Sequence, residues 1–494
     1  MIRRSPFVLS LIALLVVAPF ASAEVLSDIW FETVLAGSPV GYVHEVTETR
    51  PTSIVTGVES RIVVERMGRP VLIDGRERWA ETPTGEPLSY RSTARLAVEE
   101  TTLDATVDDG VIKLRKATGE DATHTSLPFD EDLLWPFAIR QLHAEHAGTE
   151  GTTYSFATFD PELEAVVEYD VEVLGSETVT LLGEARSLHK IRLVTPSYPG
   201  VEFVEWRDDA GRLWKMEAPE LSVAAARTTR ESAQASREAT DLVASTMIKT
   251  NADILEPYAV DEALYELWLE DGAEMAGRIP EDARQTIEGT TDRGILLRVR
   301  RVVPDSTRTV TFPVRGAEFE KYLEGNSLMQ TWYLRILGAA SKSVWETGQD
   351  AWLGAVGIEA WVFRIIDNKG FGTALASARE VIERQEGDCS EHAVLTAAMA
   401  RSVGIPARLV SGIVHADGRF AYHMWVEVWT GDGWYALDAT VGRGSVDATH
   451  IKFADSAAEN GRVGDLAVAI APFFNRLNVR VVEYTIDGET HTVN

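Results

Sequence analysis

The chain of 494 residues contains a single cysteine, Cys389, so its folded state cannot rely on an internal disulfide. Residues 1–23 nevertheless have the pattern of an export signal: two arginines, a mostly apolar run and a small-x-small sequence that predicts cleavage after Ala23. An uncleaved membrane anchor is the alternative, but the apolar run is short for a bilayer span. We therefore expect a periplasmic or secreted protein stabilised by large cores. Its lone thiol is either a buried apolar side chain or a reactive group.

Composition narrows the class of protein further. Hydrophobic residues make up 45% of the chain, and the formal net charge is −29 with a sequence pI of about 4.8. Such an acidic surface repels phosphate backbones, which argues against nucleic-acid binding. After the signal, no stretch is long and apolar enough for a membrane span, so we expect none in the mature protein.

The pattern of apolar residues changes four times along the chain. Residues 24–223 show short alternating runs between turns and predict an antiparallel β-rich domain. Residues 224–246 are polar and predict a linker or an exposed helix, and residues 247–316 predict a small β domain with a strand at 307–314. Residues 317–494 begin with helical spacing and return to strand patterns after the cysteine, at 406–414, 421–429 and 434–439.

Cys389 stands at the predicted start of a helix. Asp388 is a typical N-cap and Glu391 follows three residues later, as in a capping box. The helix should run to about Arg401. Unpaired N–H groups and the helix dipole favour an anion in the first turn, and a thiolate is the anion that a cysteine can form. The position suits a nucleophile better than it suits core packing.

The alternation of side chains along the predicted strands suggests a base and an acid that could act with Cys389. In residues 421–429, His423 lies on the face opposite to Met424 and Val426, which are core residues. If the turn spans 430–433, the next strand places Asp438 diagonally beside His423, within side-chain reach. Asp438 can then fix the tautomer of His423 and stabilise its imidazolium, leaving the other ring nitrogen for Cys389.

Four motifs in this region resemble the transglutaminase-like superfamily of papain-like cysteine enzymes: GDCSEHA (387–393), GIPARLVSG (404–412), HMWVEV (423–428) and WYALDAT (434–440). The resemblance implies an α+β core in which the cysteine helix packs on an antiparallel sheet. It also implies that Cys389 is the nucleophile, His423 the base and Asp438 the orienting residue of an acyl transfer from an amide of a peptide or protein substrate.

The oxyanion of such a reaction needs donors. The backbone N–H of Cys389 is a natural one. The candidates for a second are Gln385, four residues upstream, and Trp352 or Trp361, whose indole N–H the resemblance would allow. The expected neighbours of the site are Asp388, Glu391, His392 and Trp425.

Three functions remain open at this stage. The leading prediction is a cysteine hydrolase, a peptidase or amidase in which water releases the acyl group. An amine-accepting transglutaminase that forms cross-links and a non-catalytic binding or scaffold protein are the alternatives. We predict no cofactor and no metal, because one thiolate without a second cysteine is a poor zinc site. The other histidines, including His415, His450 and the H-A-E-H sequence at 143–146, are expected to be solvated.

Overall fold

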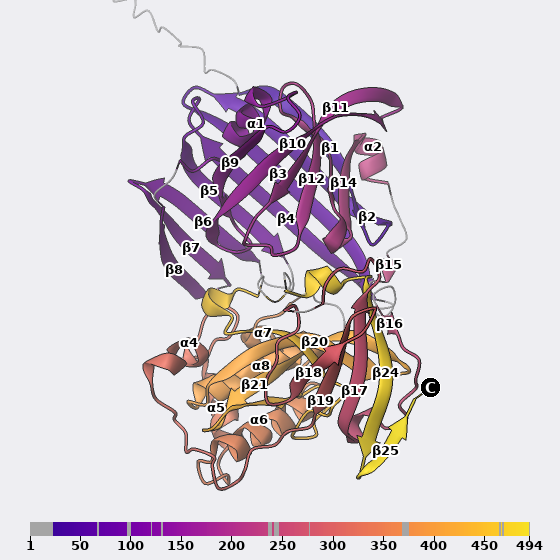
Figure 1. The fold of residues 1–494 in the computed structure, drawn as a ribbon. Coiled ribbons are helices and arrows are strands. Elements are labelled where there is room, and N and C mark those ends of the chain that lie inside the picture. Colours follow the sequence, from indigo (N-terminus) through magenta and orange to yellow (C-terminus); the bar gives the residue numbers. More distant parts are fainter. Residues whose placement is uncertain are drawn as a thin grey trace, which may run out of the picture.

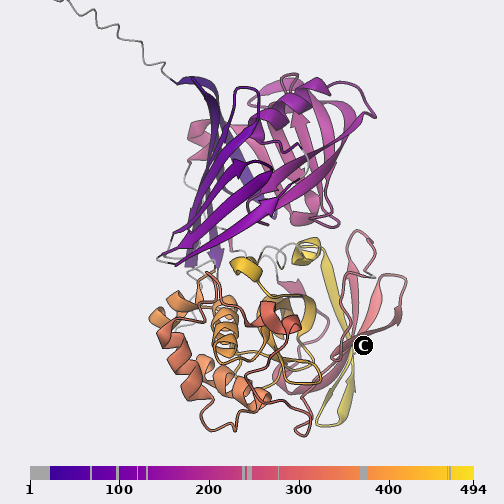
Figure 2. The same cartoon turned by 90° about the vertical axis from the view of Figure 1, so that its left-hand side faces the viewer.

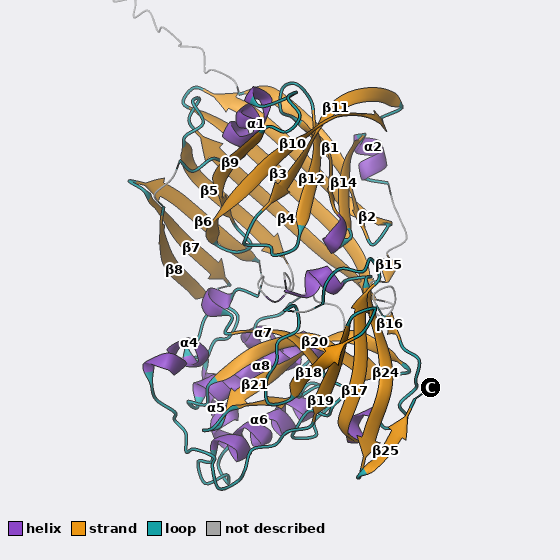
Figure 3. Cartoon of the chain, viewed as in Figure 1, coloured by secondary structure: helices purple, strands orange, loops and turns teal. Residues whose placement is uncertain are grey.

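The structure is a computed structural model that describes residues 23–493 except 67–68, 96–99, 120, 130–131, 236–239, 242–246, 276, 368–374, 464–465 and 467–468. Apart from Ala23, the predicted export signal lies outside the described residues. Figure 1 shows two units: a strand-rich N-terminal unit and a C-terminal unit that contains most of the helices. Figure 3 shows the same division by secondary structure.

The N-terminal unit is one large, strongly curved antiparallel sheet, as the alternating sequence pattern predicted. Its strand order is β8-β7-β6-β5-β4-β3-β2-β1-β14-β13-β12-β11-β10-β9. The first half comprises β1 (Glu24–Leu35), β2 (Ser38–Arg50), β3 (Ser53–Arg66), β4 (Arg69–Glu81), β5 (Pro87–Arg95), β6 (Thr101–Asp108), β7 (Val111–Thr118) and β8 (Asp121–Pro128). The second half comprises β9 (Thr153–Asp160), β10 (Ala165–Leu181), β11 (Glu184–Val194), β12 (Glu202–Arg207), β13 (Leu213–Ala218) and β14 (Val223–Thr228).

Helix α1 (Pro136–Glu145) joins the two halves and packs inside the curve of the sheet. It begins with a proline at its first position, where no N–H is needed. The buried carboxylate of Glu81 accepts the next two N–H groups, from Phe137 and Ala138, at 2.9 and 3.0 Å. The two walls of the sheet and this helix are visible in Figure 2.

Part of the segment predicted as a linker belongs to this sheet. Strand β14 pairs with both β1 and β13, so the sheet extends beyond residue 223 to Thr228. The short helix α2 (Arg230–Ala233) follows, and β15 (Thr240–Asp241) pairs in parallel with β3. The sequence pattern of 224–228 is weak because alanines replace larger apolar residues there.

The C-terminal unit contains two further sheets. One has the order β16-β21-β20-β23 with β22 also on β21, and the other has the order β18-β19-β17-β24-β25. Their strands are β16 (Ile248–Lys249), β17 (Val260–Leu269), β18 (Gln285–Thr290), β19 (Ile295–Arg300), β20 (Ala407–Ala416), β21 (Arg419–Trp429), β22 (Trp434–Leu437), β23 (Ile451–Ser456), β24 (Leu477–Ile486) and β25 (Glu489–Thr492). The helices are α4 (Glu320–Leu323), α5 (Leu334–Ser343), α6 (Ala351–Ile365), α7 (Ala378–Arg384) and α8 (Cys389–Ser402).

Two expectations for residues 247–316 need correction. They do not form a domain of their own, because β17 pairs with β24 from the end of the chain. Residues 307–314 form no strand; they run as a loop fixed by an isolated bridge between Thr311 and Asp350. The sheet built from β17–β19 and β24–β25 is thus an integral layer of the C-terminal unit.

Two hydrophobic cores hold this unit together. The first packs α5–α8 against one face of β20–β22, with Val394 and Val426 fully buried within it. The second packs the sheet of β17–β19 and β24 against β20, β21 and β23, with Tyr265 and Phe420 in ring contact. The strands that carry His423 are therefore covered from both sides.

Candidate active site

Cys389 is the first residue of α8 and is partly exposed. The N-cap Asp388 accepts from the Ser390 N–H at 2.9 Å, and Glu391 Oε2 accepts from the Asp388 N–H at 2.9 Å. The second of these bonds, together with the Glu391 N–H that donates to the Asp388 carboxylate, forms the capping box that the sequence indicates. These bonds hold the first turn in place and leave the Cys389 N–H without a hydrogen bond to any described residue.

Glu391 also organises the approach to the cysteine. Its second oxygen accepts from the Ala376 N–H at 2.9 Å, which ties the start of α7 to the start of α8. Burial, together with the nearby charge of Asp388, raises the pKa of Glu391 to about 8. The carboxyl is therefore held largely neutral near physiological pH.

His423 lies on β21 and reaches Asp438, which follows β22. The register pairs Trp429 with Trp434, as the four-residue turn predicted. His423 Nε2 lies 2.8 Å from Asp438 Oδ2, and both side chains are at least 90% buried. Because Nε2 is engaged by Asp438, Nδ1 is the nitrogen left for the hydrogen bond between His423 and Cys389.

The charged forms of His423 and Asp438 stabilise each other. Burial alone would lower the pKa of His423, but the charges of Asp438 and Cys389 and their hydrogen bonds raise it well above its usual value. Burial would likewise raise the pKa of Asp438, yet His423 and His450 hold it well below its usual range. The arrangement favours an imidazolium at His423 beside the ionised carboxylate of Asp438.

A second histidine that the sequence analysis assigned to solvent is part of this site. His450 is 1% exposed; its Nε2 lies 3.3 Å from Asp438 Oδ2 and its Nδ1 lies 3.1 Å from Asp447 Oδ2. Asp438 Oδ1 also accepts from the Thr440 N–H at 2.8 Å. The only local signal was the D-x-x-H spacing of 447–450, which is too common to single out.

The turn that carries Asp447 and His450 is held from a distant part of the chain. Arg284, 3% exposed, donates from Nη2 to the backbone oxygens of Asp447 at 2.8 Å and His450 at 3.3 Å. The Tyr265 hydroxyl donates to the Ala448 oxygen at 3.0 Å. Residues of the β17–β19 sheet therefore position the groups behind Asp438.

A buried carboxyl on α6 borders the same loop. Glu359 is 1% exposed and accepts from the Gly444 N–H at 2.9 Å. Burial and the charge of Asp438 raise the pKa of Glu359 to about 7, although its backbone hydrogen bonds act in the opposite direction. The sequence analysis did not single out Glu359.

The remaining predicted site residues lie around this set in different roles. Trp425 is 1% exposed, with its ring centroid 6.2 Å from that of His423 and 5.3 Å from that of His450. Trp425 thus forms one wall beside both histidines. His392 is fully buried and its Nδ1 lies 2.6 Å from the Asp388 oxygen, so it braces the helix start.

The candidate oxyanion donors differ in exposure. Gln385 is an exposed residue in the left-handed conformation at the end of α7. Trp352 and Trp361 are half-buried on α6 and pack against the helical core. The face of β21 that carries His423 is covered, since Trp425 and Glu427 are buried there. His415 on β20 was expected to be solvated, but it is also buried.

Within the described part of the chain, His423, Asp438 and His450 are the group with the spacing of metal ligands, their donor atoms lying within 4.8 Å of one another. Both histidines already share Asp438 Oδ2 at hydrogen-bond distances. A metal ion would have to replace both of these bonds, so hydrogen bonding accounts for the cluster as it stands.

Comparison with known proteins supports the C-terminal assignment. Residues 336–439 match the family model of the Transglutaminase-like superfamily, a range that contains Cys389, His423 and Asp438. The resemblance of the C-terminal region to this superfamily is thereby confirmed. An uncharacterised protein of Mycobacterium leprae is 36% identical over 75 residues, which cover 13% of this chain and 26% of that relative.

Two solved structures are also similar. A candidate cysteine protease from Cytophaga hutchinsonii has 15% identity and a TM-score of 0.32, covering 48% of this chain and 87% of its own. A beta-barrel-like protein of unknown function from Brucella abortus has 14% identity and a TM-score of 0.32, covering 41% of this chain and 94% of its own. Within the described residues, no helix is long and apolar enough to cross a bilayer.

Proposed function

We propose that the protein is an exported transglutaminase-like cysteine hydrolase that cleaves amide bonds of peptide or protein substrates through a thioester. The observation that carries the proposal is the position of His423, whose ring is hydrogen-bonded to Cys389 on one side and lies 2.8 Å from Asp438 on the other. This is the arrangement of nucleophile, base and orienting acid that acyl transfer needs.

In the proposed first half-reaction, the Cys389 thiolate attacks the carbonyl carbon of the amide and a C–S bond forms. The carbonyl electron pair moves to oxygen, where the free N–H of Cys389 can donate to it. The His423 imidazolium then gives its proton to the amine nitrogen, the C–N bond breaks and the amine leaves. Asp438 keeps the ring in place throughout, because its carboxylate is itself held by Thr440 and His450.

In the second half-reaction, neutral His423 takes a proton from water, and the resulting hydroxide attacks the thioester. The C–S bond breaks, a carboxylic acid leaves, and the thiolate–imidazolium pair is restored. An amine could take the place of water, and then the product would be a new amide. The site chemistry is the same in both cases.

The decisive experiment uses a peptide mixture as substrate, since the proposal names a bond type rather than one peptide. Wild-type protein and Cys389→Ala are incubated with a tryptic digest, with and without dansylcadaverine, and products are identified by mass. New peptide termini that need Cys389 support the hydrolase. Cysteine-dependent dansyl labelling without cleavage would replace it with the amine-accepting reaction. The absence of both would favour the binding or scaffold alternative.

A further inference from the structure

A cavity of about 320 Å³ lies inside the curved sheet of the N-terminal unit. One wall comes from β1–β3, the other from β9–β13, and α1 closes it on a third side. The volume is at the lower end of the range for small-molecule sites, which is roughly 300–1,000 Å³. None of the residues placed in the candidate active site lines this cavity.

Much of the lining is apolar. Ring and thioether side chains come from five strands and from the helix: Phe31, Phe137, Phe156, Tyr169, Phe203 and Met216. Tyr169, Phe203 and Met216 are partly exposed, and the Tyr169 ring also contacts those of Phe156 and Phe203. They provide a surface for an apolar group of a ligand.

Four charged side chains in and beside the cavity are paired within the protein. Arg207 donates from Nε to Glu205 at 2.7 Å and from Nη1 to the Gly211 oxygen at 2.7 Å. Arg212 donates from Nε to Asp208 at 3.0 Å. These bonds hold the β12–β13 turn in place, and each of the four charged groups has a partner of opposite charge.

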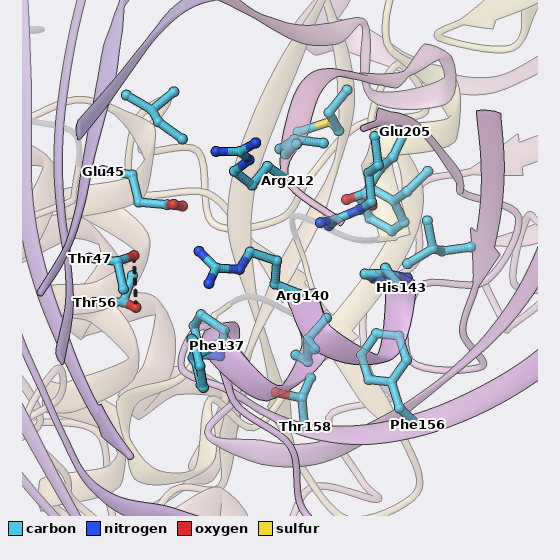
Figure 4. A pocket seen from close by; sticks show the side chains of 18 of the residues that line it. Glu45, Thr47, Thr56, Phe137, Arg140, His143, Phe156, Thr158, Glu205 and Arg212 are labelled. Atoms are coloured by element: carbon cyan, nitrogen blue, oxygen red, sulfur yellow. Dashed lines mark hydrogen bonds and ion pairs between the residues drawn. The ribbon is translucent and has the colours of Figure 1, made fainter. Parts of the chain in front are cut away.

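Two charged side chains are left over. Arg140 on α1 and Glu45 on β2 form no hydrogen bond or ion pair with any described residue, although both line the cavity. Figure 4 shows them extending from opposite sides into the same space. Burial raises the pKa of Glu45 despite the nearby arginines, and burial lowers the pKa of Arg140. Arg140 lies 5.1 Å from the centre of the Phe137 ring. Both charges are thus partly desolvated with no hydrogen-bond or ion-pair partner, which is costly.

A third polar group in the lining also lacks a partner. His143, expected at the surface, is 4% exposed, and its Nδ1 lies 2.6 Å from the Tyr154 hydroxyl. Burial lowers the pKa of His143 to about 2 and raises the pKa of Tyr154 to about 12. Burial thus favours a neutral ring, and its Nε2 has no hydrogen-bond partner among the described residues.

We propose that this cavity binds a small zwitterion with an apolar side chain, such as an amino acid or a dipeptide. Its carboxylate would pair with Arg140, its ammonium group with Glu45, and its side chain would rest on the aromatic lining. His143 Nε2 is a further hydrogen-bonding group for a polar atom of the ligand. The site goes beyond the proposed hydrolase activity and does not depend on it, because binding needs no residue of the cysteine site.

The test is isothermal titration of the mature chain carrying Cys389→Ala, which prevents turnover. L-Phenylalanine is compared with N-acetyl-L-phenylalanine, which lacks the ammonium group, and with L-phenylalaninamide, which lacks the carboxylate. We expect L-phenylalanine to bind with a Kd of about 1 mM or tighter, and each analogue at least about tenfold more weakly. This comparison needs no change in the cavity itself.

Two variants then test which side chain binds each charged group of the ligand. Arg140→Gln should remove the preference for phenylalanine over its amide, and Glu45→Gln should remove the preference over the N-acetyl form. Arg115→Gln is the matched control, because this exposed arginine on β7 faces Asp104 at 3.6 Å, outside the cavity. The proposal is overturned if phenylalanine, leucine and alanyl-phenylalanine all fail to bind. Equal binding of the three phenylalanine probes would also overturn it.

Discussion

Replacing Asp438 by asparagine tests the central electrostatic argument without knowledge of the substrate. The carboxylate lies 2.8 Å from His423 Nε2, and both groups are at least 90% buried. With an effective dielectric constant of about 20, the Coulomb energy of this pair is about 6 kcal/mol, which sets an upper limit. A hydrogen bond to a charged group contributes about 1.5–3 kcal/mol, and asparagine can still accept from the ring, so the expected loss is well below this upper limit.

The sign of the effect follows from the pKa of His423. Asp438 raises that pKa, so the imidazolium persists at pH values where a free histidine would be neutral. Without the carboxylate charge, burial lowers the pKa of His423, and the imidazolium that stabilises the thiolate is lost. We therefore expect alkylation of the protein at pH 6 to slow by at least about tenfold, which is the equivalent of about 1.4 kcal/mol.

The assay is the rate of iodoacetamide alkylation between pH 5 and 9, read by intact mass; a chain with one cysteine gives one signal. Asp447→Asn is the matched control, because Asp447 is equally buried but contacts His450, one step further from the cysteine. Its effect should be smaller. An unchanged rate and pH profile in a folded Asp438→Asn protein would refute the assigned role of Asp438.

The remaining predictions concern stability and the support of the site. Folding raises the pKa of Glu391 to about 8, so the contribution of this carboxyl to stability is full at acid pH and is lost as pH rises through 8. Urea unfolding at pH 6 and pH 9 should show a lower free energy of unfolding at pH 9 for the wild type. The difference between the two pH values should be smaller for Glu391→Gln. Arg284→Met removes one donor from the oxygens of Asp447 and His450, of which Asp447 keeps a 3.4 Å bond from the His450 N–H. We expect a loss of about 1–3 kcal/mol in stability and slower alkylation. A Cβ at Gly412 would lie 2.0 Å from a backbone oxygen of β23, whereas a Cβ at Gly338 meets nothing within 4 Å. Gly412→Ala should therefore lower the free energy of unfolding by more than about 2 kcal/mol and Gly338→Ala should not; similar values for both would contradict the packing.

Much of the cysteine site was predictable because its determinants are local. The start of α8 depends on Asp388 and Glu391, which lie within three residues of each other. The proximity of His423 and Asp438 depends on a four-residue turn and on the twofold alternation of side chains along a strand. Such rules act over a few residues, so they can be read directly from the sequence.

The errors came from pairings between distant segments. Strand β17 pairs with β24 more than two hundred residues later, and Arg284 reaches the turn that holds His450. Nothing in the local pattern of residues 247–316 indicates either contact. His450 was assigned to solvent for the same reason, since its burial depends on a layer whose partner strands are far apart in the chain.

The sequence by itself determined the position of Cys389 at a helix start, the register that brings His423 beside Asp438, and the antiparallel character of the N-terminal unit. These features follow from hydrogen bonds and alternation within short segments. Only the tertiary structure decided that His450 and Asp447 stand behind Asp438, and that Arg140 and Glu45 face one cavity without direct partners. Burial and charge at those positions are set by which distant surfaces pack together, and that depends on the whole chain.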